Sequence, residues 1–86
     1  MNNKVLIKLI VPEIDEEFDI FIPVNEIIWK IKKMLVKCVN DVKGVSFDMN
    51  KDYILLKKEN NRLYKNNELV IDTDIRNASE LLLFSK

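Results

Sequence analysis

Residues 26–44 have the sequence EIIWKIKKMLVKCVNDVKG, in which apolar side chains recur at the three- and four-residue spacing of one helix face. Asn25 is the expected N-cap, with Glu26 in the first turn, and Gly44 supplies the left-handed residue after the last turn. The segment predicts an amphipathic helix over residues 26–42. At the angular step of an α-helix its apolar side chains share an arc of about 140°; they are Ile27, Ile28, Ile31, Met34, Leu35, Cys38, Val39 and Val42.

Short β-branched segments on both sides of this helix predict strands. Residues 4–11 alternate, and the face expected to meet the core carries Val5, Ile7, Leu9 and Val11. Residues 18–22 alternate in the same way after an acidic turn at 13–17, which predicts an antiparallel hairpin. The other expected elements are strands at 53–57, 62–64 and 81–84 and a short helical turn near 73–75.

This order of elements predicts an α+β fold. One helix and four to five short strands cannot build a doubly wound sheet, so the helix is expected to cover one face of a mixed sheet. The last strand is expected to pair with the first in the middle of that sheet, because both apolar strands then bury one face under the helix.

Composition limits the class of protein. The chain has 86 residues, of which 48% are apolar, and we expect a single domain over residues 1–86. Fourteen basic residues balance fourteen acidic ones, which argues against a dedicated nucleic-acid binder. The N-terminal apolar stretch is too short and too charged for a signal peptide or a membrane span, so we expect a cytoplasmic protein.

The sequence offers little for catalysis, and we expect no enzyme activity, no cofactor and no metal. There is no histidine, and a single glycine cannot form a glycine-rich phosphate loop. Cys38 is the only cysteine, which rules out an intramolecular disulfide, and its place on the apolar arc predicts a core residue. The acidic run at 13–19 lacks the spacing of a Ca²⁺ loop and is expected to be a solvated turn.

Three segments resemble ubiquitin-like proteins: KGV at 43–45, RLYKNNEL at 62–69 and VIDTDIRNASELLL at 70–83. The resemblance covers nearly the whole chain and implies a ubiquitin-like β-grasp. Ala78 stands where the family usually has glycine, and Asn77 is expected to take the left-handed conformation in its place. Among such proteins the chain is most similar to the bacterial YukD family, which is associated with type VII secretion.

The resemblance implies a non-catalytic protein-interaction module that serves as an accessory or regulatory component of a secretion system. The chain stops after the last expected strand, at Phe84-Ser85-Lys86, without a terminal Gly-Gly tail. Conjugation to substrates is therefore not expected. Other proteins, including secretion-system components, are the expected partners, and a homodimer is an open alternative.

We expect the sheet face turned away from the helix to be the binding surface, because it would expose one apolar patch. The expected site residues are Leu6, Lys8, Ile10, Tyr53, Leu55, Leu82 and Phe84, with Lys57 at the rim. This holds if Ile54 and Leu56 point inward. The alternatives are that the third strand has the opposite orientation, or that a loop covers the patch.

The outer face of the helix is a second candidate, formed by Trp29, Lys33 and Val36. Trp29 and Val36 lie outside the apolar arc, where they could anchor a partner or lie under a nearby loop. The helix lysines Lys30, Lys32, Lys33 and Lys37 could contact an acidic partner or nucleic acid, although a solvated face is the better expectation.

Overall fold

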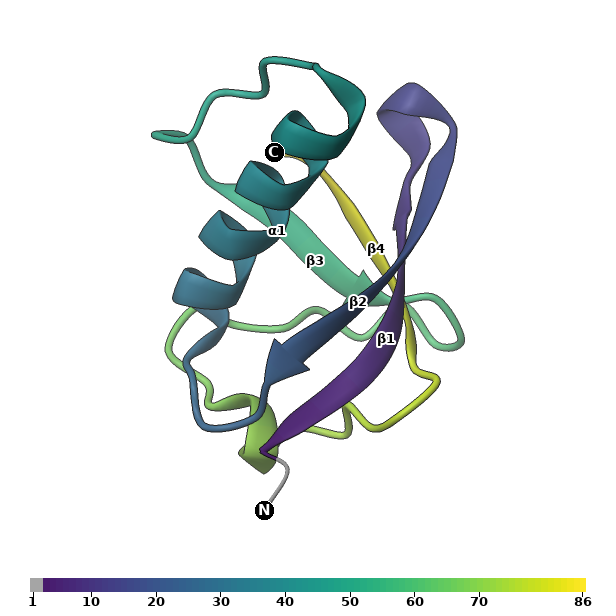
Figure 1. Ribbon diagram of the computed structural model, residues 1–86. Helices are drawn as coiled ribbons and strands as arrows, with labels where there is room; N and C mark the ends of the chain where they lie inside the picture. Colours follow the sequence, from purple (N-terminus) through teal and green to yellow (C-terminus); the bar gives the residue numbers. More distant parts are fainter. Residues whose placement is uncertain (1–2) are drawn as a thin grey trace.

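The chain forms one helix laid across a four-stranded mixed sheet (Figure 1). The computed structural model describes residues 3–86. In chain order the elements are β1 (Lys4–Val11), β2 (Glu16–Pro23), α1 (Ile28–Lys43), β3 (Tyr53–Lys57) and β4 (Glu80–Ser85), with short 3-10 helices at Pro12–Ile14 and Val70–Asp72. The strand order is β2-β1-β4-β3.

The strand pairing follows the expected plan. β1 and β2 form an antiparallel hairpin, from Lys4 opposite Pro23 to Val11 opposite Glu16. β4 lies parallel to β1 and antiparallel to β3. The last strand therefore occupies the centre of the sheet beside the first, as predicted, and β2 and β3 form the two edges.

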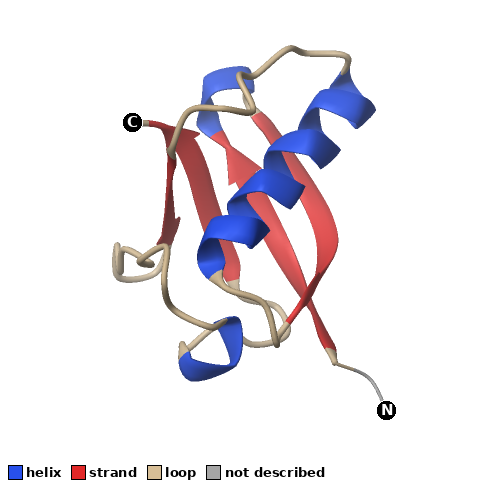
Figure 2. Cartoon of the chain, turned by 90° about the vertical axis from the view of Figure 1, so that its left-hand side faces the viewer, coloured by secondary structure: helices blue, strands red, loops and turns tan. Residues whose placement is uncertain are grey.

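The core lies between α1 and one face of the sheet, as the two layers in Figure 2 show. Ile7, Leu9 and Val11 are buried on β1, which confirms the core face predicted for that strand. Leu81 and Leu83 supply the same layer from β4. Burying each such side chain stabilises the fold by about 1.5–3 kcal/mol, so these alternating residues hold the helix on this face.

The start of the helix differs from the prediction. α1 begins at Ile28, and the N-cap is Ile27, which makes no side-chain capping hydrogen bond. Carbonyl groups of a distant segment accept from the free N–H groups instead: the Ile28 N–H donates to Glu68 at 2.8 Å and the Trp29 N–H to Asn66 at 3.1 Å. Asn25 is therefore not the cap, because tertiary contacts satisfy the donors that a capping side chain would satisfy.

The helix end is as predicted. Gly44 has a φ of 66° and donates its N–H to the Asn40 carbonyl at 2.9 Å.

The buried face of α1 is turned from the predicted arc. Val42 was expected to face the core and is 63% exposed, whereas Lys32 and Val36 are buried. The buried arc is rotated by about 60°, less than the angle between successive residues. Lys32 allows this rotation because its Nζ pairs with Asp52 at 3.2 Å, so its stem packs in the interior while its charge is compensated.

The segment between β3 and β4 holds less regular structure than predicted. Residues 62–64 do not form a strand, and Leu63 makes only an isolated bridge to Leu56. The helical turn falls at Val70–Asp72 and not at 73–75. Thr73 ends it: its hydroxyl donates to the Val70 carbonyl at 2.6 Å and accepts from the Ile75 N–H at 3.2 Å.

The turn before β4 places Ala78 in the left-handed region, with a φ of 73°. The expectation that Asn77 would take this conformation is wrong. The Asn77 side chain instead binds β1, because its Oδ1 accepts a hydrogen bond from the Leu6 N–H at 2.8 Å. The Ala78 N–H donates to the Leu6 carbonyl at 2.8 Å. Both backbone groups of Leu6 are thus bonded to this turn, which holds the turn against β1.

Ala78→Gly is expected to raise the free energy of unfolding by about 0.5–1 kcal/mol. Left-handed backbone costs alanine about 1–2 kcal/mol, and the larger unfolded-state entropy of glycine offsets part of that relief. Ser46→Gly is the control, because Ser46 is an exposed loop residue outside the left-handed region. Urea denaturation of the two variants checks the prediction, which is contradicted if both variants lose stability equally.

Candidate functional site

The sheet face turned away from α1 carries a mixture of apolar and charged side chains. Alternate residues of every strand point to this side, as the burial patterns show. Five of the seven predicted site residues lie here: Leu6, Lys8, Ile10, Leu82 and Phe84.

The orientation predicted for the third strand is wrong. Leu55 is fully buried and Tyr53 is 5% exposed, so both belong to the core and neither lies on the uncovered face. Ile54 and Leu56 point to that face instead. The strand is apolar on both sides, and Lys57 shares a side with Tyr53 and Leu55 by alternation. Lys57 does not mark a solvated face, because its Nζ pairs with Asp74 at 3.1 Å at the strand end.

The apolar residues of the uncovered face are neighbours in the strand register. Ile10 lies opposite Leu82, Leu82 opposite Leu56, and Phe84 opposite Ile54. In antiparallel pairs directly opposed residues have Cβ atoms about 4.5–5.5 Å apart, so the pairs between β3 and β4 are close neighbours, and Ile10 continues their row on the parallel strand β1. We name them the sheet-face patch: Ile10, Ile54, Leu56, Leu82 and Phe84, all half-buried. Leu63, bridged to Leu56 and 54% exposed, extends its edge.

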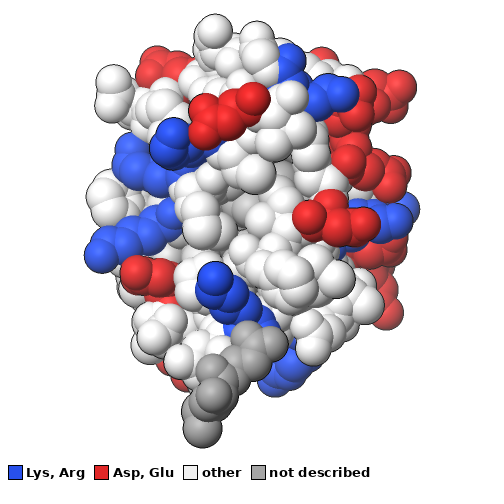
Figure 3. Space-filling view, in the orientation of Figure 1, with Lys and Arg blue, Asp and Glu red and all other residues white. Residues whose placement is uncertain are grey.

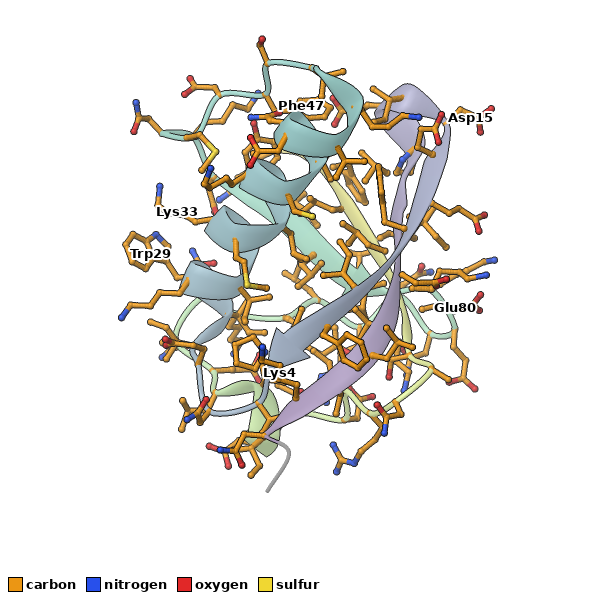
Figure 4. All side chains as sticks on the ribbon, viewed as in Figure 1. Lys4, Asp15, Trp29, Lys33, Phe47 and Glu80 are labelled. Atoms are coloured by element: carbon orange, nitrogen blue, oxygen red, sulfur yellow. The ribbon has the colours of Figure 1, made fainter. Side chains whose placement is uncertain are left out.

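A charged row bounds the sheet-face patch. Lys8 lies opposite Asp19 on β2 and opposite Glu80 on β4, and its Nζ is 3.6 Å from Glu17 Oε1. Beyond this row Leu6 and Phe21 lie opposite each other and form a second exposed apolar area. Figure 4 shows Glu80 pointing to the side of the molecule opposite Trp29 and Lys33. The sheet-face patch therefore has a charged border on the side of Lys8.

The three predicted residues on the outer face of the helix have different environments. Trp29 is 44% exposed, Lys33 is half-buried and Val36 is buried. The alternative of a covering loop thus holds for Val36 and not for Trp29. The loop after α1 is fixed by Asn40, whose Nδ2 donates to the Phe47 carbonyl at 3.0 Å and whose Oδ1 accepts from the Phe47 N–H at 2.9 Å.

Charges are distributed unevenly over the surface. In the view of Figure 3 acidic side chains gather on the right, along the hairpin side, and basic ones on the left, along the side of α1. The lysine side also carries acidic partners: Lys37 pairs with Asp41 at 3.1 Å, and Lys32 with Asp52. The helix therefore does not present a continuous basic stripe.

Asp52 is the acidic group that compensates the buried Lys32. Burial works to raise the pKa of the Asp52 carboxyl, but the hydrogen bond and positive charge of Lys32 outweigh it, so the pKa lies below its ordinary value.

The described residues contain few groups of catalytic type. Cys38 is half-buried and not fully buried as expected. Within residues 3–86 no three His, Cys, Asp or Glu side chains are placed to hold a metal ion together. No helix in this part of the chain is long and apolar enough to cross a membrane.

A partly buried network joins β3 to the segment before β4. The Tyr64 hydroxyl donates to Asp74 Oδ1 at 2.7 Å, and Arg62 and Lys57 each pair with the same carboxylate at 3.1 Å. Partial burial tends to raise the pKa of Asp74, but these hydrogen bonds and charges hold it below its ordinary value. Burial and the adjoining carboxylate raise the pKa of Tyr64. The network fixes the irregular segment and, with its charges compensated, has a structural role.

Sequence reasoning missed Ile54, Leu56 and Leu63 as members of the exposed face. The alternation of β3 offers no signal, because both faces of the strand are apolar. Leu63 points outward because Arg62 and Tyr64 pair with Asp74 on the core side, a tertiary contact that the sequence alone does not reveal.

No protein-family model and no curated protein matches the chain. Solved structures do match it. A chain of the MycP5-free ESX-5 inner membrane complex is 11% identical with a TM-score of 0.76, and the match covers 95% of this chain and 21% of that one. This chain therefore spans only a small part of the ESX-5 chain.

Two ubiquitin-like domains are also similar. One, from an Arabidopsis thaliana protein, is 14% identical with a TM-score of 0.74, and the match covers 99% of this chain and 80% of that one. The other, an N-terminal ubiquitin-like domain, is 9% identical with a TM-score of 0.69, over 100% and 78%. These likenesses confirm the predicted fold: the chain is a ubiquitin-like β-grasp, with one helix on a four-stranded mixed sheet.

Proposed function

We propose that this chain is a non-catalytic ubiquitin-like interaction module that binds another protein through the sheet-face patch. The observation that carries the proposal is the patch itself. Ile10, Leu82 and Leu56 form a continuous apolar row across three strands, and no helix covers it. Contiguous exposed apolar patches on small proteins are commonly interaction sites.

The form of this face suits a protein surface better than a small molecule. An apolar area bordered by charged groups, here Lys8, Glu17 and Glu80 on one side, is common in protein interfaces. The proposal names no catalytic residue, because the polar groups around Asp74 are already paired with one another in ion pairs.

The proposed setting is bacterial type VII secretion, with the chain as a cytoplasmic accessory or regulatory component. Two observations support it: the similarity of the chain as a whole to the YukD family among ubiquitin-like proteins, and the likeness to a chain of the ESX-5 inner membrane complex. The alternative is that a second copy of the chain covers the sheet-face patch in a symmetric homodimer.

Affinity purification from native lysate tests the proposal with three baits: the wild type, Leu56→Lys and Val42→Lys. Leu56 lies in the patch, whereas Val42 is an exposed apolar residue on α1 and serves as the matched control. We expect the wild type and the control to retain secretion-system proteins and Leu56→Lys to lose them. Equal recovery by all three baits would place the site elsewhere, and recovery of the chain alone would indicate a homodimer.

A further inference from the structure

The sheet has one open edge. Its outer strands are β2 and β3, since the strand order is β2-β1-β4-β3. The edge at β3 is partly closed by the segment that follows it: the Lys57 N–H donates to the Arg62 carbonyl at 2.9 Å, and the Tyr64 N–H donates to the Leu55 carbonyl at 3.0 Å. Within residues 3–86 the outer side of β2 receives no such hydrogen bonds. The open edge is therefore that of β2.

The register determines which backbone groups of β2 point outward. The Val24 N–H donates to the Asn3 carbonyl at 2.8 Å, and bonded and non-bonded pairs alternate along an antiparallel ladder. The backbone groups of the even-numbered residues of β2 are therefore turned to β1. Those of Glu17, Asp19 and Phe21 are turned away from β1 and have no hydrogen-bond partner among residues 3–86. Such a row of unpaired groups is a template for a further strand.

The side of this edge that α1 does not cover is acidic. Glu17 and Asp19 are exposed, and Lys8 lies opposite Asp19 on one side and Glu80 on the other. The Lys8 Nζ is 3.6 Å from Glu17 Oε1, so one ammonium group lies among three carboxylates. Figure 3 shows the acidic side chains gathered along the hairpin side. Basic side chains on an added strand would compensate this excess of negative charge.

The side of the same edge that faces α1 is apolar. Phe18 and Ile20 pack against the core and remain half-buried. The acidic residue on this side, Glu16, already pairs with Lys43 at 3.1 Å. Apolar side chains of an added strand would contact Phe18 and Ile20 and remove more apolar surface from water. The edge therefore favours a strand that is apolar on one side and basic on the other.

We propose that β2 binds an extended segment of a partner protein in which basic and apolar side chains alternate. The segment lies antiparallel to β2, the more stable arrangement per residue, and becomes a fifth strand of the sheet. Its backbone pairs with the free groups of Glu17, Asp19 and Phe21. Its basic side chains lie opposite Glu17 and Asp19, and its apolar side chains lie beside Phe18 and Ile20. This site is separate from the sheet-face patch and does not rest on the function proposed for it.

The acidic row disfavours a second copy of the chain as the added strand. A symmetric antiparallel pair of β2 strands centred on residue 17, 18 or 19 places carboxylates directly opposite carboxylates, which is destabilising. A pair centred on residue 20 or 21 places an acidic residue opposite Pro23, which has no N–H to donate. Charged residues on an edge strand commonly prevent such self-pairing.

The exchange of backbone amide hydrogens with water tests the proposal residue by residue. The full chain is titrated with the capped peptide Lys-Val-Lys-Val-Lys and, as a matched control, with Glu-Val-Glu-Val-Glu. At saturation with the basic peptide we expect exchange to slow at least about tenfold at Glu17, Asp19 and Phe21. The amides of Phe18 and Ile20 are already bonded to β1 and should change little. The acidic peptide should slow none of the three.

Two N-methylated forms of the basic peptide test the backbone pairing. Methylation of the central lysine removes an N–H that points to β2, and is expected to weaken binding at least about tenfold. Methylation of a valine removes an N–H that points away from β2, and is expected to change binding by less than about threefold. The two peptides have the same charge and composition, so a difference between them reports strand pairing.

Two variants of the chain test the charge pairing. Asp19→Asn is expected to weaken binding of the basic peptide about threefold, the usual scale of an exposed ion pair. Glu59→Gln removes the same charge from an exposed residue after β3, at the other edge of the sheet, and is expected to leave binding within about 1.5-fold.

Four results would overturn the proposal. Exchange at Glu17, Asp19 and Phe21 could be unchanged by the basic peptide, or slowed equally by the acidic one. Equal binding of the two N-methylated peptides would show that the backbone of β2 is not used. Slower exchange at these three amides as the protein concentration rises without peptide would assign the edge to a second copy of the chain.

Discussion

Leu55→Lys is expected to unfold the chain, whereas Leu56→Lys leaves it folded. Leu55 is fully buried between α1 and the sheet, so the replacement removes core packing worth about 2–5 kcal/mol. It also places an unpaired ammonium group in the interior, at a cost of several kcal/mol. The sum approaches the whole stability of a typical domain, about 5–15 kcal/mol.

Leu56 lies one position along the same strand and points to the uncovered face. Its side chain is half-buried against Leu82, and a lysine there can extend into water. We expect a loss of about 1 kcal/mol and a cooperative melting transition. Thermal melting of the two variants, followed by circular dichroism, shows which of them is folded. A folded Leu55→Lys together with an unfolded Leu56→Lys would show that the orientation of β3 is the reverse of that described.

Asp74→Ala is expected to lower the free energy of unfolding by about 1–3 kcal/mol. The replacement leaves the buried Tyr64 hydroxyl without its acceptor and separates Lys57 and Arg62 from their shared carboxylate. Asp41→Ala is the control, because its carboxylate forms an exposed ion pair with Lys37. It is expected to change stability by less than about 0.5 kcal/mol. Urea denaturation measures both variants, and equal losses would contradict the role given to the network.

The contribution of Asp74 depends on pH in a defined direction. Its pKa is lower in the folded chain than the ordinary value of about 3.9 that it has when unfolded. Its stabilising contribution is therefore complete above that value and is lost as the pH falls through the folded pKa. The stability difference between wild type and Asp74→Asn should accordingly shrink on acidification. Glu13 and Asp52 have lowered pKa values as well, so the wild type itself is expected to lose stability in acid.

The elements with one apolar face were predictable from the sequence. β1 alternates cleanly, and its core face was confirmed by the burial of Ile7, Leu9 and Val11. The helix was predicted because its apolar residues recur at helical spacing and Gly44 ends it. Its rotation was not predicted, because the burial of Lys32 depends on Asp52, which lies in the loop before β3.

The uncovered face was only partly predictable. Periodicity determines the inward side of a strand when one side is polar, and in β3 both sides are apolar. Lys57 was expected at the rim of the patch and instead pairs with Asp74, which comes from a segment 17 positions further along the chain. The helix start was missed for a similar reason: carbonyl groups of Asn66 and Glu68 bind its free N–H groups. Sequence patterns contain neither kind of contact.

The central claim is that a partner protein covers the sheet-face patch. Methyl chemical-shift mapping tests it most directly, with the isotope-labelled chain titrated with the partner recovered by affinity purification. We expect the largest shifts at Ile10, Ile54, Leu56 and Leu82 and little change at Val42 on the far side of α1. Shifts confined to methyl groups beside Trp29, such as those of Val36 and Met49, with none on the sheet-face patch, would contradict the claim.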